Sequence, residues 1–238
     1  MRRLAATIGE WSVPGELPPL AHWIFHVPQE PQSALGPDGH PRKGGFLPPI
    51  EQPRRMWAGG RVEWLASIPV GATMHKTTTI ASIEEKRAAS GSMTLLTLRH
   101  VIAVDGRQAI VEEQDIVYLP IAAPAATRPV ARPVPASERA MVVDERLLFR
   151  FSALTFNAHR IHYDLPFARE VELYPALVVH GPLQAMLLAR DAAMPLGRFA
   201  YRGRSPLYAN ERFFVRCAAD ELWIAKEDGT VTMTATAE

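Results

Sequence analysis

The stretch LVVHGPLQAMLLARDAAM, residues 177–194, decides the fold of the second half of the chain. Pro182 suits the first turn of a helix, where its missing N–H costs nothing. Leu183 and Leu187 then lie one helical turn apart, on one apolar face. Pro195 follows directly and cannot continue the helix. The stretch therefore predicts one apolar helix.

Several strand-like runs follow this helix, rich in β-branched and aromatic residues: 199–204, 212–217, 221–226 and 230–236. The last two flank Asp228-Gly229, a dipeptide typical of tight hairpin turns. A further strand is expected over residues 147–151, before the helix. A single long helix wrapped by an antiparallel sheet satisfies this order.

The first half has a similar β content and a weaker helix, expected over residues 20–27. A passage rich in Gly and Pro, LGPDGHPRKGGFLPP at 35–49, holds too many breakers for regular structure. From Arg61 onward the sequence is rich in strand-forming residues, and a hairpin is expected over 93–119 around Asp105-Gly106. The two halves look like two copies of one architecture, although no residue-level repeat is visible.

A proline-rich segment separates the halves. Residues 121–137, IAAPAATRPVARPVPAS, carry four prolines, which exclude both a helix and a central strand. We therefore divide the chain into an N-terminal half (1–120), a linker (121–138) and a C-terminal half (139–238).

Composition excludes several classes of protein. The 238 residues are 47% hydrophobic and 21% charged, as in ordinary globular proteins. Lys and Arg number 26 against 25 Asp and Glu, so no basic surplus indicates nucleic-acid binding. The single cysteine, Cys217, permits no internal disulfide, and we expect it to be a buried apolar residue. No apolar run of 18 residues and no signal peptide is present, so we expect no membrane span and a cytoplasmic location.

The chemistry is expected in FRFSALTFNAHRIHYD, residues 149–164. Asn157, His159 and His162 lie within six residues of one another, ahead of the predicted helix. His180-Gly181 stands where that helix starts. His100, in the other half, shares the apolar context of these histidines.

Three interpretations of these histidines remain open. A zinc site is one. Against it, His159-x-x-His162 with His180 has no thiolate or carboxylate ligand beside it and lacks the helical spacing of common zinc sites. Structural histidines in polar turns are the second. General acid–base use is the third and is favoured, because the unperturbed histidine pKa near 6.5 suits proton transfer near neutral pH.

The passage resembles the hydratase-2 motif of MaoC-like hot-dog enzymes, Gly-Asp-x-Asn-Pro-x-His-x-Asp, followed by a helix that opens with His-Gly. The motif histidine corresponds to His162. Asn157 stands in place of the motif aspartate, His159 in place of its asparagine and Arg160 in place of its proline. An amide thus replaces the expected carboxylate.

The resemblance is greater to one subgroup, which includes the mesaconyl-C4-CoA and itaconyl-CoA hydratases, and extends to mitochondrial 3-hydroxyacyl-thioester dehydratase. LPPLAHWIF, GPDGHPRKGGFLPP, RRMWAGG and EEQDIVYLP of the first half share in it. It implies an α+β double hot dog, in which two antiparallel sheets each wrap a helix, and a homodimer is a further expectation. It also implies addition of water to a C5-dicarboxylyl-CoA, without metal or cofactor, because coenzyme A enters with the substrate.

The resemblance also implies roles for individual residues. His162 is expected to act as the base for water, Asn157 to orient that water, and His159 to be the reserve for a second proton transfer. The N–H of Gly181 or its neighbour would hold the thioester oxygen at the helix start. Candidate substrate-binding residues are Arg54, Arg55 and Arg160 for the free carboxylate, Arg202 and Arg204 for the phosphates, and His180.

Other functions stay open beside this one. A 3-hydroxyacyl-thioester dehydratase would run the same chemistry backwards on straight acyl chains. A thioesterase would use the same cleft for hydrolysis. A non-catalytic acyl-CoA-binding protein is also compatible with Asn157 in place of the carboxylate.

Overall fold

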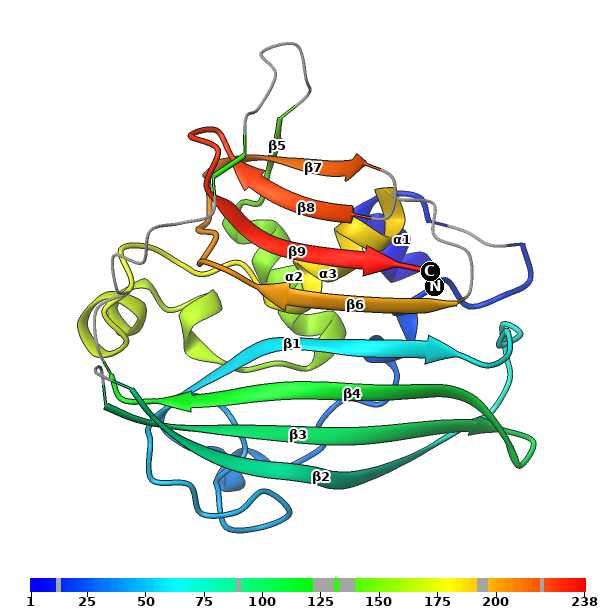
Figure 1. The fold of residues 1–238 in the computed structure, drawn as a ribbon, viewed down its shortest axis with the longest axis horizontal. Helices are drawn as coiled ribbons and strands as arrows, with labels where there is room; N and C mark the ends of the chain where they lie inside the picture. Colours follow the sequence, from blue (N-terminus) through cyan, green and yellow to red (C-terminus); the bar gives the residue numbers. More distant parts are fainter. Residues whose placement is uncertain (12–13, 89–90, 122–130, 133–139, 192–196, 219–220) are drawn as a thin grey trace.

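The computed structural model describes residues 1–11, 14–88, 91–121, 131–132, 140–191, 197–218 and 221–238. Within them, one antiparallel sheet of nine strands runs in the order β2-β3-β4-β1-β6-β9-β8-β7-β5 (Figure 1). The strands are β1 Arg54–Trp64, β2 Met74–Ala88, β3 Gly91–Val104, β4 Arg107–Leu119, β5 Met141–Val142, β6 Arg198–Gly203, β7 Arg212–Ala218, β8 Glu221–Lys226 and β9 Val231–Ala237. The helices are α1 Arg2–Ile8, α2 Glu145–Thr155, α3 Gly181–Asp191, three 3-10 turns (η1 Ala21–Ile24, η2 Gln32–Ala34, η3 Arg160–His162) and a π turn, η4 Phe167–Val171.

The two halves of the chain meet edge to edge where β1 pairs with β6. Two glycines permit this close approach. A Cβ on Gly59 would stand 2.5 Å from the Tyr201 carbonyl oxygen, and one on Gly60 would stand 2.6 Å from the Glu113 carbonyl oxygen. The two predicted sheets are therefore joined into one.

The predicted helix is α3, and it forms the centre of the C-terminal half. Every residue from Leu183 to Ala189 is buried, and the helix packs on β1, β7, β8 and β9. A helix that is buried all round belongs in the core rather than on the surface. Its one buried polar side chain, Gln184, accepts a hydrogen bond from the Thr232 hydroxyl at 2.7 Å.

The N-terminal half has no comparable helix among its described residues. The helix expected over 20–27 is the single turn η1, because Pro28 and Pro31 follow closely and cannot continue it. Loop residues cover this half of the sheet instead. Leu47 and Ile50 pack on a small cluster formed by β3 and β4 (Leu96, Leu98, Ile116 and Tyr118).

The strand expected over 147–151 is wrong, because these residues lie within helix α2. The Asp144 carboxylate accepts a hydrogen bond from the N–H of Leu147 at 2.9 Å and so caps the first turn. Leu148 and Phe151, three residues apart, are the buried pair. The short apolar run fits a helical face as well as a strand, and the cap decides between them.

The other predicted strands and both hairpins are confirmed, except that β1 begins at Arg54, before the expected start of strand structure at Arg61. Asp105 and Gly106 adopt positive φ angles of 49° and 76° between β3 and β4, as a tight turn requires. The other turn, at Asp228-Gly229, joins β8 to β9. The linker 121–138 lies mostly outside the described residues (122–130 and 133–139), so the division into halves stays a prediction.

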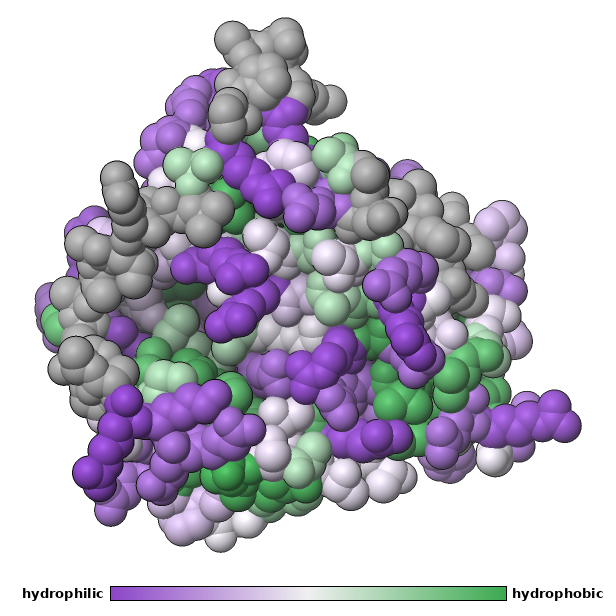
Figure 2. Space-filling view, in the orientation of Figure 1, coloured by the Kyte–Doolittle hydropathy of each residue, from purple (hydrophilic) through white to green (hydrophobic). Residues whose placement is uncertain are grey.

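The prediction for Cys217 is wrong, because the thiol is exposed. It lies towards the end of β7, beyond the two residues that β5 covers, Phe213 and Arg212. Figure 2 shows hydrophilic side chains gathered over the middle of this face of the molecule, with hydrophobic ones around them. On the paired strands β1 and β4, Arg61 forms ion pairs with Glu113 and Asp115. In the described part of the chain, no helix is long and apolar enough to cross a membrane.

Candidate active site

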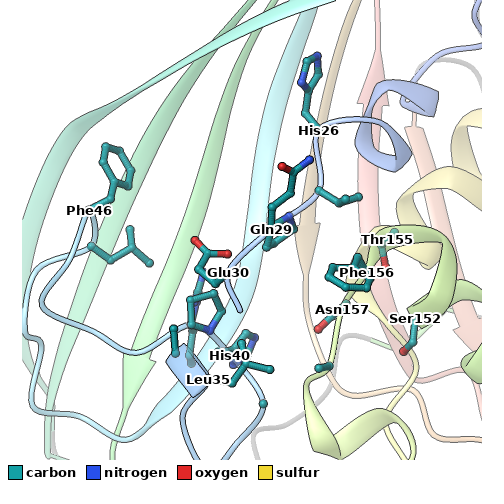
Figure 3. A pocket seen from close by; sticks show the side chains of 18 of the residues that line it. His26, Gln29, Glu30, Leu35, His40, Phe46, Ser152, Thr155, Phe156 and Asn157 are labelled. Atoms are coloured by element: carbon teal, nitrogen blue, oxygen red, sulfur yellow. The ribbon is translucent and has the colours of Figure 1, made fainter. Parts of the chain in front are cut away.

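A cavity of about 1720 Å³ lies against the inner face of β1–β4, where a long helix is missing (Figure 3). Alternate residues of these strands form its floor, since side chains two apart share a face: Arg55 and Trp57, Lys76 and Thr78, Leu98 and His100, Glu112 and Gln114. The opposite walls come from the loop after η1 and from the end of α2. Figure 3 shows His40 on the first wall and Asn157 on the second.

A row of four imidazoles runs inward from this cavity. The ring centroids of His40 and His159 are 4.1 Å apart, those of His159 and His162 are 5.4 Å apart, and His162 stacks on His180 at 3.6 Å. We call these four residues the histidine row. His40 lines the cavity, whereas the other three are buried behind its wall.

His162 is held as a neutral imidazole. Its Nδ1–H donates to the carbonyl oxygen of Val178 at 2.8 Å, which leaves the lone pair on Nε2. Burial lowers its pKa to about 4, and the Val178 hydrogen bond offsets this only in part. Burial also lowers the pKa of His159 and that of His180 well below the usual value. At neutral pH these three side chains are therefore potential proton acceptors.

Asn157 shapes the loop that carries these histidines. Helix α2 ends at Phe156 in the left-handed conformation, with φ of 48°, and Asn157 follows. Its side-chain oxygen accepts the N–H of His159 at 2.9 Å. The amide NH₂ remains available toward the cavity that Asn157 lines. An amide can do both, whereas the carboxylate of the motif could only accept.

Gly181 lies at the edge of the cavity, at the start of α3. A Cβ on it would stand 3.7 Å from the Trp57 carbonyl oxygen, and Trp57 and Pro182 both line the cavity. The first hydrogen bond across this turn runs from the N–H of Gln184 to the carbonyl of His180. The Gly181 N–H precedes it and is an orphan donor of the helix start, whereas its neighbour Pro182 has no N–H. Behind it, His180 Nε2 and the Ser152 hydroxyl are hydrogen bonded at 2.9 Å.

The candidate arginines have different surroundings. Arg54 is buried and forms an ion pair with Glu172 at 2.9 Å, so its guanidinium is already engaged. Arg55, its neighbour in β1, lines the cavity. Arg160 binds Asp164 at 2.7 Å and the Pro37 carbonyl at 3.0 Å.

The arginines expected to hold phosphates lie elsewhere. Arg202 and Arg204 are exposed, and neither is among the described residues that line the cavity. Arg204 donates to the Thr234 hydroxyl at 3.0 Å. The structure thus brings together Arg55, Asn157 and the histidine row, and it leaves this pair outside.

Two residues of the site were missed, Asp38 and His40. Their passage is irregular by its Gly and Pro content and shares in the family resemblance, but neither feature predicts a part in the site. Yet one Asp38 oxygen accepts the backbone N–H of His40 at 3.1 Å, and the other accepts its Nδ1–H at 2.9 Å. The Asp-Gly-His sequence is a signal for such a turn, because an Asp side chain commonly binds the backbone two residues on.

A buried hydrogen-bond network around Glu112, a residue of the cavity floor, was also not predicted from the sequence. The Glu112 carboxylate accepts hydrogen bonds from His22 Nε2–H and Trp23 Nε1–H, each at 2.9 Å. Burial alone would raise the pKa of Glu112, but the bond and charge of His22 outweigh it, so the pKa lies below its usual value. Glu112 is thus a carboxylate that ties η1 to β4.

The sequence of this site can be compared with known proteins. A model of the family described as hydroxyacyl-thioester dehydratase type 2 matches residues 20–209, which span the cavity and the histidine row. The chain belongs to this family. As a hydroxyacyl-thioester dehydratase type 2 protein it is an enzyme, a hydro-lyase, as predicted.

Relatives of the family agree with this conclusion. The mesaconyl-C(4)-CoA hydratase of Chloroflexus aurantiacus is 44% identical over 233 residues, which cover 93% of this chain and 83% of that protein. The crystal structure of HtdX from Mycobacterium tuberculosis superposes with a TM-score of 0.72 at 15% identity, over 99% of this chain and 93% of that one. Another Mycobacterium tuberculosis protein, described as a double hot-dog fold, superposes with a TM-score of 0.55 at 13% identity, over 99% of this chain and 85% of that one. This type 2 dehydratase-family chain is therefore a CoA hydratase with the predicted double hot-dog fold.

Proposed function

We propose that the protein adds water to mesaconyl-C4-CoA to give citramalyl-CoA, and that itaconyl-CoA is its second substrate. The observation that carries the proposal is the position of Arg55 in the cavity, beside the histidine row. The charge of Arg55 lowers the pKa of both His40 and His159, so the guanidinium lies within electrostatic reach of the row. A free carboxylate on the acyl group would bind this guanidinium. The 44% identical mesaconyl-C(4)-CoA hydratase supports the same substrate.

The reaction assigns a task to each group. Nε2 of His162 takes a proton from water while the oxygen bonds to the β-carbon, and the double-bond electrons move into the thioester carbonyl. The Gly181 N–H holds the oxygen on which negative charge develops. The α-carbon then takes a proton, which completes the addition of one water. The Asn157 NH₂ orients the attacking water.

The two substrates differ in what they demand of the site. In mesaconyl-C4-CoA the double bond is conjugated with the thioester carbonyl, so water adds directly. In itaconyl-CoA it is not, and a proton must first leave the α-carbon. A site that exchanges α-protons would therefore accept both.

A second candidate is dehydration of straight-chain 3-hydroxyacyl thioesters, which the family description supports. The apolar side chains that line the cavity favour this reaction, among them Phe25, Phe46 and Phe151. These would accept an alkyl chain as readily as the methyl group of a C5 acid. Neither candidate needs a metal or other cofactor. The homodimer and the cytoplasmic location stay predictions.

The test compares mesaconyl-C4-CoA, itaconyl-CoA and crotonyl-CoA as substrates for the wild type and for Arg55→Met. Arg87→Gln, an exposed arginine of β2, is the matched control. We expect kcat/KM for the dicarboxylyl substrates to fall about 100-fold in Arg55→Met, because a charge-assisted hydrogen bond contributes about 1.5–3 kcal/mol. Crotonyl-CoA should be little affected. A wild type that prefers crotonyl-CoA would support the dehydratase instead.

A further inference from the structure

We propose that His40, hydrogen-bonded to Asp38, is a second catalytic acid–base that moves the proton at the α-carbon of the acyl thioester. The inference rests on the proposed hydratase chemistry but not on the identity of the acyl group. It assigns the N-terminal half of the chain a part in the reaction itself.

The turn that carries His40 is built against the histidine loop. Gly39, at a φ of +90°, lies so close to the loop that an added Cβ would overlap the carbonyl oxygen of Ala158. The N–H of Arg160 donates to the Asp38 carbonyl at 2.9 Å, and its guanidinium donates to the Pro37 carbonyl at 3.0 Å. Three separate contacts thus fix the position of His40 relative to His159.

The site lacks a carboxylate where the hydratase-2 motif has one, and Asp38 supplies one from another part of the chain. Asn157 cannot take a proton, and its oxygen already holds the N–H of His159. The Asp38 carboxylate lies in the same cluster, since one of its oxygens and one ring nitrogen each of His40 and His159 all lie within 4.8 Å of one another. The charge that the motif position has lost is therefore restored through His40.

Asp38 makes His40 a better proton carrier than His162. The Nδ1–H of His40 donates to a carboxylate, which stabilises the imidazolium that forms when Nε2 takes a proton. The Nδ1–H of His162 donates only to a neutral carbonyl. The pKa of His40 lies below its usual value, because burial lowers it more than the hydrogen bond to Asp38 raises it, and the charge of Arg55 lowers it further. The side chains of His40 and Asp38 are 18% and 24% exposed, so His40 can exchange protons with solvent.

His40 also lies where it can reach the acyl group. It lines the cavity itself, whereas His159 and His162 are buried deeper in the histidine row. In the hydration direction, His162 takes the proton of water, and Nε2–H of the His40 imidazolium delivers its proton to the α-carbon. His40 is left neutral and His162 protonated, and solvent exchange resets both. In dehydration, neutral His40 removes the α-proton and His162 protonates the departing hydroxyl.

A divalent cation is a competing occupant of the same cluster. Against it, Asp38 and His40 are already hydrogen bonded to each other, which leaves only two imidazole nitrogens for a metal. Zinc sites in proteins ordinarily use three or four ligands. Activity that is lost on dialysis against a chelator and restored by Zn²⁺ would overturn the acid–base proposal in favour of a metal.

The decisive measurement is incorporation of deuterium from ²H₂O at the α-carbon of saturated thioesters that cannot lose water. Methylsuccinyl-C4-CoA and butyryl-CoA serve as probes, followed by mass spectrometry, beside net hydration of the unsaturated substrates. His40→Gln should lower both exchange and hydration at least 100-fold. His162→Gln should lower hydration but leave exchange. His75→Gln, an exposed histidine of β2, is the control and should change neither.

Asp38→Asn keeps His40 and tests the positioning role of the carboxylate. We expect kcat to fall 10- to 100-fold with little change in KM, a shift of the pH profile of exchange, and partial rescue by Asp38→Glu. Exchange that persists in a folded His40→Gln protein, or that is absent from the wild type with both probes, would overturn the proposal. Preference for crotonyl-CoA with exchange intact would reject only the C5 substrate.

Discussion

His162 and His180 stack face to face, with 3.6 Å between ring centroids and 19° between ring planes. Two protonated imidazoles in this arrangement would repel each other, and burial lowers the pKa of both side chains. At neutral pH the stacked pair is therefore uncharged.

Acid should destabilise the protein in the range set by these groups. His162 has a pKa of about 4 when folded and 6.5 as a free side chain. Between these values the unfolded chain binds a proton that the folded protein does not, so the free energy of unfolding falls as pH falls. Denaturant titrations from pH 7 to 4 measure the slope. His162→Gln should reduce that slope by up to about 1.4 kcal/mol per pH unit; an unchanged slope would contradict the assignment.

Gly39→Ala should damage the site through one contact. The new methyl would overlap the Ala158 carbonyl oxygen and stand 2.6 Å from its carbon, so the turn must move away from the histidine loop. We expect hydration to slow at least 10-fold. Gly44→Ala is the matched control, because Gly44 has a similar φ of +94° with nothing within 4 Å. Equal losses in the two variants would show that backbone strain, rather than the contact, matters.

Removal of the Glu172 side chain should lower the free energy of unfolding rather than the rate of the reaction. Glu172→Ala leaves Arg54 buried beside the Tyr174 ring without its carboxylate partner. Breaking one member of a buried pair typically costs about 3–5 kcal/mol. Glu63→Ala, in the exposed pair with Arg198, should cost at most about 1 kcal/mol. Chemical denaturation of both variants gives the comparison, and similar losses would contradict it.

The exposure of Cys217 can be tested in the native protein. A thiol reagent such as 5,5′-dithiobis(2-nitrobenzoic acid) should react with one equivalent of thiol without denaturant, because the side chain is exposed. Hydration activity should survive, since Cys217 is not among the cavity-lining residues of the described chain. Reaction only after unfolding would restore the prediction of a buried cysteine.

Local sequence patterns predicted the parts of the fold that local interactions determine. Pro182 and the leucine spacing placed α3, and Asp105-Gly106 placed a hairpin, because both signals act within a few residues. Residues 147–151 are wrongly predicted, because five mostly apolar residues show no distinct period and only the cap at Asp144 indicates a helix.

The same distinction between local and long-range interactions holds for the residues of the site. His159 and His162 could be found because they are neighbours in the sequence. His40 could not, because its role depends on contacts with residues 119 and more positions away, made through Gly39 and the Arg160 N–H. Burial of Arg54 against Glu172, 118 positions away, likewise has no local signal.

The missing helix of the N-terminal half has a consequence for how such an enzyme can change. Its cavity is walled on one side by loop residues whose backbone takes no part in the sheet. Insertions or replacements there would resize the acyl chamber while the packing around α3 stays intact. Substrate range and structural integrity are therefore encoded in different stretches of the chain, and selection can alter the first without endangering the second.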